Sequence, residues 1–160
     1  MDVTAKLLNW MIHFVEVPNP NLGGWAPCPY AKQARINDKI SIRFSNDLIN
    51  EVPKCLPDLE TKDVVVICFD HTIINANEIE QLVSDLNKTL LGNDYVILED
   101  HPDQIENVNG VRMNFGECGL LIIQRLSKLN ASSALLKDKG YYQVWDQSSL
   151  DYVVSWRSND

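Results

Sequence analysis

The sequence predicts an α+β fold, a ferredoxin-like sandwich of a four-stranded sheet and helices in which one strand is permuted to the front. Two observations lead to this prediction. An apolar run at 63–69, an amphipathic segment at about 76–91 and a second apolar run at 94–98 have the pattern of a right-handed parallel crossover. A third apolar run at 120–124 follows after a long polar loop, so it can insert antiparallel between those two strands. A small doubly wound α/β sheet is the alternative.

The segment before the crossover predicts a helix, a loop and the remaining strand. Residues 3–16 carry apolar side chains at helical spacing, and the prolines and glycines of "VPNPNLGG" end that helix. Residues 39–44 alternate polar and apolar side chains, which predicts a half-buried strand. A short helix is expected at 47–54. The apolar stripe of the first helix consists of Val3, Leu7, Leu8, Met11, Phe14 and Val15.

The helix of the crossover has the clearest boundaries. Asn75 as its N-cap, with Glu78 three residues later, is close to a capping box, and Gly92 marks its end. Another helix at about 127–138, ending at Gly140, is expected to cover the same face of the sheet.

The last segment is rich in aromatic side chains, and we expect it to pack back on the body of the protein. The predicted organisation is a single domain over 1–160. It consists of an N-terminal helix with a Cys-Pro loop (1–36), an α/β body (37–140) and an aromatic C-terminal tail helix (141–160).

Composition and charge narrow the classes of partner. The net charge is −8, from 22 acidic and 14 basic residues, and this charge disfavours nucleic acid and anionic membrane surfaces as partners. No apolar run approaches the ~20 residues of a membrane helix, and the N-terminus lacks the pattern of a signal peptide. The four cysteines are widely spaced without a CxxC motif, so we expect free thiols in the cytoplasm.

The first candidate site is the stretch "NLGGWAPCPYAKQARI", which places Cys28 directly before Pro29. Proline is favoured at the first position of a helix, so Cys28 is expected near an N-cap, facing free backbone N–H groups. Lys32 and Arg35 add positive charge one and two turns later. These features favour a thiolate, the form required of a nucleophile or metal ligand. The alternative is an inert cysteine in a rigid loop.

The second candidate site lies where two strands end. Asp70 and His71 follow one strand of the crossover, and Asp100 and His101 follow the other. Parallel strands finish at the same edge of a sheet, where open α/β sheets place ligands. Imidazole and carboxylate groups suit a divalent transition metal, or a histidine base oriented by an acid. The alternative is that these polar residues only terminate strands.

Two other features bear on the site. Arg125 follows the strand at 120–124 and could face an anionic ligand or pair with a surface acid. The Asn109-Gly110 pair predicts a turn, in a hairpin or in a flap over the sheet edge. The sequence contains no Walker loop, GxGxxG, GxSxG or HExxH motif, which disfavours nucleotide hydrolysis, a dinucleotide fold and a serine triad.

The stretches "APCPYAKQARI", "DHPDQ" and "LLIIQRLSKLNAS" resemble the ordered landmarks of an uncharacterised bacterial domain family. That family combines a Cys-Pro-aromatic-Ala motif, a downstream His-Pro pair and a short apolar strand that ends in arginine. The resemblance implies a shared site at Cys28, His101 and Arg125. The chain departs from the family at Ile122, where the family has histidine, and lacks a clear counterpart of its Arg-Ser-Pro run.

These features lead to two hypotheses. The first is a small soluble enzyme with Cys28 as thiolate, redox group or metal ligand and His101 as acid–base group or co-ligand, acting on a small molecule that Arg125 would steer if it is anionic. The second is a non-catalytic interaction module in which the aromatic tail forms a homodimer or partner surface.

Overall fold

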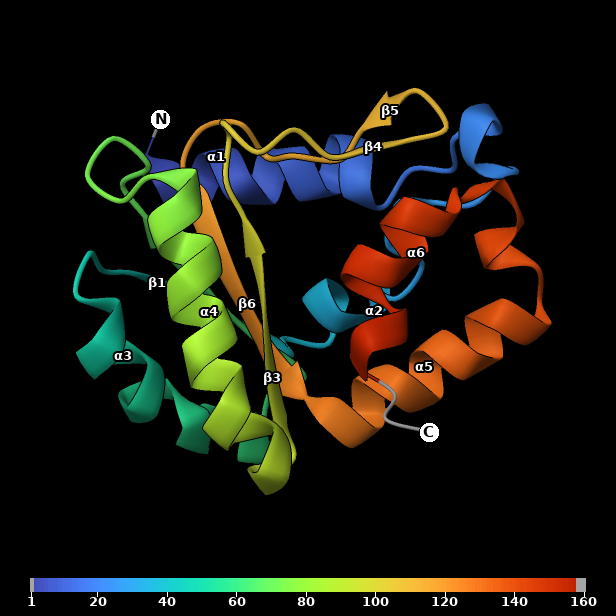
Figure 1. Ribbon diagram of the computed structural model, residues 1–160. Coiled ribbons are helices and arrows are strands. Elements are labelled where there is room, and N and C mark those ends of the chain that lie inside the picture. Colours follow the sequence, from blue (N-terminus) through green and yellow to red (C-terminus); the bar gives the residue numbers. More distant parts are fainter. Residues whose placement is uncertain (1, 158–160) are drawn as a thin grey trace.

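The computed structural model describes residues 2–157 (Figure 1). Its main sheet has four strands in the order β1-β2-β6-β3, and β1 runs parallel to β2. Strand β6 lies between β2 and β3 and is antiparallel to both, as the sequence predicted. The protein therefore has an α+β fold with a mixed sheet. The strands are β1 (Ile40–Phe44), β2 (Val64–Phe69), β3 (Tyr95–Asp100) and β6 (Gly119–Arg125).

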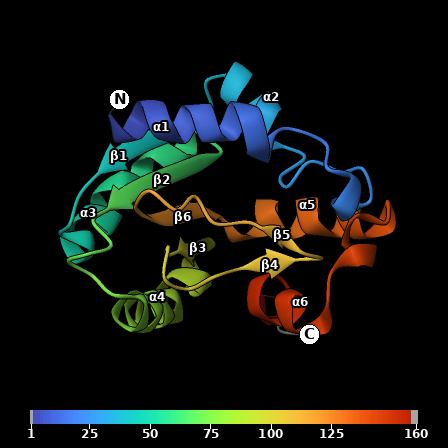
Figure 2. The ribbon, with the colours of Figure 1, turned by 90° about the horizontal axis from the view of Figure 1, so that it is seen from above.

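Two helices, α3 (Leu48–Cys55) and α4 (Ala76–Leu90), cover one face of the sheet (Figure 2). The start of α4 is the predicted one, because Asn75 Oδ1 accepts a hydrogen bond from the Glu78 amide at 2.9 Å. The core on this face consists of Leu48, Val52, Cys55, Leu59, Val65, Ile67, Phe69, Ile79, Val83, Ile97, Leu121 and Ile123.

The opposite face of the sheet carries α1 (Val3–Trp10), its π-helical continuation Met11–Val15 and the short α2 (Ala31–Ile36). The predicted apolar stripe of the first helix supplies this contact. The second core consists of Leu7, Met11, Ala31, Val66, Cys68, Phe115, Cys118 and Leu120.

The helix after β6, α5 (Leu126–Asp138), differs from its prediction. It runs away from the sheet instead of covering the α4 face (Figure 1), and it adds no residue to the core on that face. The Ser127 amide and hydroxyl both bond to the Asp94 carboxylate, at 2.8 and 2.7 Å. These bonds hold the start of α5 beside the residue that precedes β3, so α5 begins directly at the end of β6.

The aromatic tail packs back on the body, as predicted. It contains a 3₁₀ turn (Tyr141–Val144), α6 (Gln147–Val153) and a second turn (Ser155–Arg157). Tyr141 is buried, and its hydroxyl donates a hydrogen bond to the Pro27 carbonyl. Residues 158–160 of the predicted tail lie outside the described residues.

The loop at 101–118 contains the predicted hairpin, formed by β4 (Asn107–Val108) and β5 (Val111–Arg112). Asn109 and Gly110 have φ of 48° and 81°, as a two-residue hairpin turn requires. The hairpin packs on the loop after α1, where Asn109 Nδ2 donates to the Asn21 carbonyl at 2.7 Å.

The remaining 3₁₀ turns are Pro20–Leu22, Leu56–Glu60 and Leu91–Asn93. Over the described residues, none of the helices combines the length and the apolar character that crossing a membrane requires.

Candidate functional site

A large open cavity with a volume of about 1650 Å³ is lined by the α1 face of the sheet, the hairpin loop, α4, α5 and the C-terminal tail. Pockets for drug-sized ligands have volumes of about 300–1,000 Å³. The cavity exists because α5 runs away from the sheet and the tail returns toward it, so the two leave space between them.

The sheet contributes an apolar wall to this cavity. Leu98 of β3 and Ile122 of β6 are register partners, and both line it. Strand β6 is central in the sheet, yet Ile122 is only half-buried. The apolar face of a sheet is usually buried against a second layer of the fold. Helices α1 and α2 therefore leave part of this face open toward the cavity.

The tail contributes aromatic side chains to the lining of the cavity. Tyr142, Trp145 and Trp156 are half-buried and line the cavity beside the buried Tyr141. The rings of Tyr142 and Trp145 meet edge to face, with centroids 5.2 Å apart. Aromatic side chains with a polar tip are typical of ligand pockets.

Cys28 also lines the cavity, and it is the one exposed residue among the four free cysteines. Although the residue as a whole is exposed, protein atoms surround its sulfur, and this desolvation raises the pKa of the thiol above its ordinary value. The amide groups of Tyr30 and Ala31 lower the pKa, in the predicted sense, but by less. Arg35 does not oppose this effect, because Glu16 holds its guanidinium with two bonds of 2.7 and 2.9 Å. The predicted direction of the Cys28 pKa is therefore wrong, and the thiol form is favoured.

His101 is almost completely buried, and both of its ring nitrogens are occupied. Its Nε2 lies 2.8 Å from the Ile74 carbonyl, and its Nδ1 accepts a hydrogen bond from the Asp103 amide at 3.1 Å. With Nδ1 as the acceptor, Nε2 carries the proton and donates to the Ile74 carbonyl. Within residues 2–157, no contact joins His101 to Cys28, whose backbone bonds to Val15 instead. The structure does not bring the two predicted catalytic residues together.

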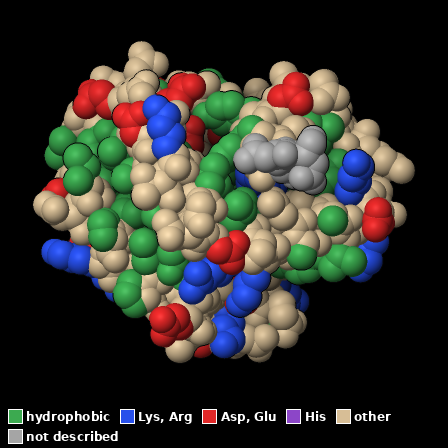
Figure 3. Space-filling view, turned by 60° about the horizontal axis from the view of Figure 1, so that its bottom comes forward, with side chains coloured by type: hydrophobic (Ala, Val, Ile, Leu, Met, Phe, Trp, Pro, Cys, Tyr) green, Lys and Arg blue, Asp and Glu red, His purple; other side chains and the backbone are tan. Residues whose placement is uncertain are grey.

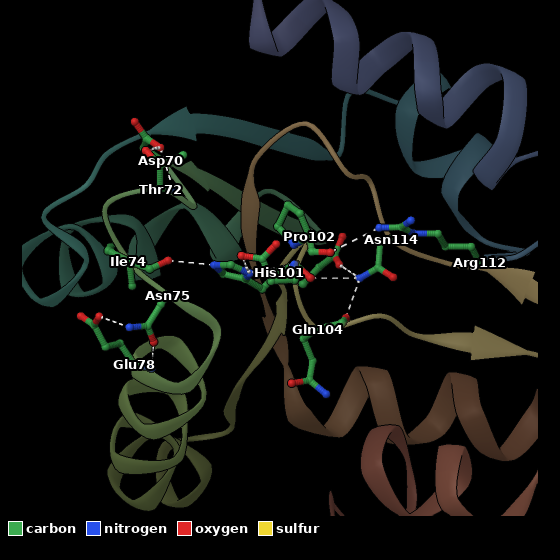
Figure 4. A network of polar contacts seen from close by, with 12 residues as sticks. Asp70, Thr72, Ile74, Asn75, Glu78, His101, Pro102, Gln104, Arg112 and Asn114 are labelled. Atoms are coloured by element: carbon green, nitrogen blue, oxygen red, sulfur yellow. Dashed lines mark hydrogen bonds and ion pairs between the residues drawn. The ribbon is translucent and has the colours of Figure 1, made fainter.

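Asn114 is the centre of a polar network that orders the loop after β3, and Figure 4 shows it beside His101 and Gln104. Asp100 belongs to the same network. Asn114 Nδ2 donates to Asp100 Oδ1 at 2.6 Å, and the Phe115 amide donates to Oδ2 at 2.9 Å. The same Asn114 nitrogen lies 3.2 and 3.0 Å from the carbonyls of His101 and Gln104. Burial raises the pKa of Asp100 despite these bonds. The network stabilises the loop that forms one side of the cavity.

The predicted metal ligands are only partly brought together. The rings of His71 and His101 do meet, with centroids 5.9 Å apart, so the two strand ends converge as expected. Asp70 instead binds Thr72, whose amide and hydroxyl hold the pKa of Asp70 below its ordinary value, and Asp100 is held by Asn114. Over residues 2–157, no three His, Cys, Asp or Glu side chains are arranged to hold a metal ion.

Arg125 lies at the opposite end of the sheet from His101. It is the register partner of Tyr95 at the start of β3, and its guanidinium carbon sits 4.4 Å from the centre of that ring. The five residue-to-residue steps from Tyr95 to Asp100 along β3 span roughly 17 Å. Arg125 therefore cannot share a ligand with His101.

Carboxylate groups with raised pKa values lie along the free edge of β3. Tyr152 of α6 donates to Glu99 Oε1 at 2.7 Å, and burial raises the pKa of Glu99. Burial, with the charges of Asp100 and Glu99, raises the pKa of Glu106 to about 7. Sequence reasoning missed Glu106 and Asn114, because nothing in their local sequence distinguishes them from loop residues.

Comparison of the chain with protein-family models, curated proteins and solved structures finds no match in any of the three. The resemblance of "CPYA" and His101-Pro102 to an uncharacterised bacterial family therefore stays a prediction.

Proposed function

We propose that the protein binds a small, mainly apolar molecule in the cavity between the sheet and the C-terminal tail. The observation that carries this proposal is the half-open sheet face. A central strand that presents Ile122 and its neighbour Leu98 to a cavity of about 1650 Å³ loses part of the free energy that burial would supply. A ligand that covers these side chains restores it.

The walls favour a ligand with an aromatic or aliphatic body. Aliphatic side chains of the sheet and the rings of Tyr142, Trp145 and Trp156 line the same cavity. A flat or elongated apolar molecule would contact both sets of side chains. The net charge of −8 supports a small molecule over nucleic acid as the partner.

An enzymatic role for Cys28 is the second candidate, because it is the exposed thiol of the chain and lines the same cavity. Its raised pKa makes it a weak nucleophile at neutral pH. Such a role would depend on a ligand or partner group that lowers this pKa, because the ring nitrogens of His101 bond to the backbone of Ile74 and Asp103 and not to Cys28. A maleimide probe at pH 7 tests it: reaction faster than that of free cysteine would support catalysis, and slower reaction would contradict it.

The finer description of the fold also belongs to this proposal. Strands β2, β3 and β6 with α4 follow the order of the first three ferredoxin-like strands, and β1 takes the remaining edge position, parallel to its neighbour. We describe the sheet as a permuted ferredoxin-like variant on that basis.

A fluorescence titration with N-phenyl-1-naphthylamine, an uncharged aromatic probe, tests the proposed function. We expect saturable binding of one probe per chain. Replacing Leu98→Gln places a polar group on the half-buried apolar wall and should weaken binding about fivefold, as expected for about 1 kcal/mol of lost apolar contact.

Ile49→Gln is the matched control. Ile49 is 65% exposed on α3, on the covered side of the sheet, and hydrophobic side chains gather in the half of the molecule that holds α3 and α4 (left in Figure 3). Probe binding to that surface would respond to Ile49→Gln and not to Leu98→Gln. That result, or an absence of saturable binding, would contradict the proposal.

A further inference from the structure

The tail holds a buried arginine at the wall of the cavity. Arg157 is 4% exposed, and its guanidinium donates to three neutral oxygens. Its Nε donates to the Val153 carbonyl at 2.9 Å, and its Nη2 to Ser133 Oγ at 3.1 Å. Its Nη1 lies 3.4 Å from Asn130 Oδ1, a longer contact. The hydroxyl of Tyr142 is the other polar group beside the guanidinium.

This positive charge has no carboxylate partner within residues 2–157. The ion pairs of that region include Arg35 with Glu16 and Arg43 with Asp58, but none of them includes Arg157. Burying an unpaired charge is costly, so buried arginines are normally paired with an anion. Desolvation lowers the pKa of Arg157, which reflects this cost.

The position of Arg157 relative to the cavity suggests where the anion comes from. Arg157 and Ser133 line the same cavity as Ile122 and Tyr142. A guanidinium has five N–H donors, and the three bonds to neutral oxygens leave donors for a further acceptor. Carboxylate, sulfonate and phosphate groups are the acceptors that a guanidinium binds best.

We propose that the cavity ligand is an amphipathic anion, whose acidic group pairs with Arg157 while its apolar body lies on the half-open sheet face. This inference rests on the proposed function and specifies the class of ligand. It also fixes the orientation of the ligand, because Glu99 and Glu106 at the β3 side would repel an acidic group placed there. The anionic end therefore lies toward the tail.

Two probes that differ by one sulfonate test this inference. N-phenyl-1-naphthylamine is uncharged, and 1-anilinonaphthalene-8-sulfonate carries the same rings with one negative charge. The wild-type protein should bind the sulfonate at least as tightly as the uncharged probe, although its net charge of −8 repels anions. Arg157→Gln should weaken sulfonate binding about tenfold or more, because it removes a charge-assisted hydrogen bond in a desolvated site. Binding of the uncharged probe should change by less than about twofold.

Lys128→Gln is the matched control for charge. Lys128 lines the cavity but is exposed, so its removal should change sulfonate binding by less than about twofold. Equal effects of Lys128→Gln and Arg157→Gln on sulfonate binding would overturn the inference, and so would equal effects of Arg157→Gln on both probes. In either case the proposal that the cavity binds an apolar molecule would still stand. If neither probe binds the wild-type protein, the proposed function itself fails. If circular dichroism shows that Arg157→Gln does not fold, the binding of the two probes to the wild-type protein decides. A wild-type protein that binds the uncharged probe but not the sulfonate would overturn the inference.

Discussion

Replacing Glu106 with glutamine should stabilise the folded protein at neutral pH and remove part of its pH dependence. Glu106 is half-buried beside the cavity, and desolvation with the charges of Asp100 and Glu99 raises its pKa to about 7. The folded state therefore holds the Glu106 proton more tightly than the unfolded chain does. As pH rises from 4.5 to 7, the folded state loses this advantage, so the free energy of unfolding falls.

The size of the effect follows from the same pKa. A rise from 4.5 to about 7, at about 1.4 kcal/mol per pH unit, sets an upper bound of about 3.5 kcal/mol above pH 7. Glu106 keeps some contact with solvent, which screens part of this penalty. We therefore expect Glu106→Gln to raise the free energy of unfolding at pH 8 by about 1–2 kcal/mol, and to change it little at pH 4.5.

Urea denaturation at pH 4.5, 6 and 8, followed by circular dichroism, measures this difference. Glu60→Gln is the control, because it removes the same charge from an exposed position. If Glu106→Gln destabilises the protein at pH 8, or if Glu60→Gln stabilises it equally, the interpretation that burial raises the pKa of Glu106 is refuted.

Two further substitutions test the packing around the site. A Cβ on Gly119 would lie 2.1 Å from the ring of the fully buried Phe69, so Gly119→Ala should lower the free energy of unfolding by about 1–3 kcal/mol. A thermal melt measures this loss. Gly92→Ala is the control and should have almost no effect, because its Cβ would meet no atom within 4 Å. Asn114→Ala removes the side-chain partner of Asp100 Oδ1 and of the Glu106 amide, while the Phe115 amide still bonds to Asp100 Oδ2, and it should cost about 2–4 kcal/mol. It should also weaken binding of the uncharged probe, because the loop it holds lines the cavity; unchanged binding with lowered stability would show that the loop does not shape the cavity.

The sequence predicted those parts of the fold that depend on local signals. The start of α4 follows from Asn75 and Glu78, three residues apart, and the hairpin turn from Asn109 and Gly110. The insertion of β6 follows from its apolar run and the long loop before it. Each of these signals lies within one element or between neighbours in the chain.

The direction of α5 could not be predicted in this way. It depends on the bonds between Ser127 and Asp94, which are 33 residues apart. The cavity depends on that direction and on the returning tail, so it could not be predicted either. The tail's aromatic residues indicated packing on the body, but not the space that they enclose.

The candidate site shows the same limit. The motif around Cys28 correctly indicated amides near its sulfur, but the desolvation that raises its pKa comes from the surrounding fold. The convergence of His71 and His101 was predicted from parallel strands. The position of Arg125 could have been predicted, because the end of an antiparallel β6 lies beside the start of β3, away from His101.

Methyl-resolved NMR of the protein, titrated with N-phenyl-1-naphthylamine, tests the central claim most directly. Ile122 and Leu98 face the cavity, whereas their sequence neighbours Ile123 and Ile97 lie in the core under α4. A ligand in the cavity should shift the methyl signals of Ile122 and Leu98 saturably and leave those of Ile123 and Ile97 in place. Unchanged Ile122 and Leu98 signals at saturating probe would contradict the assignment of this cavity as the binding site.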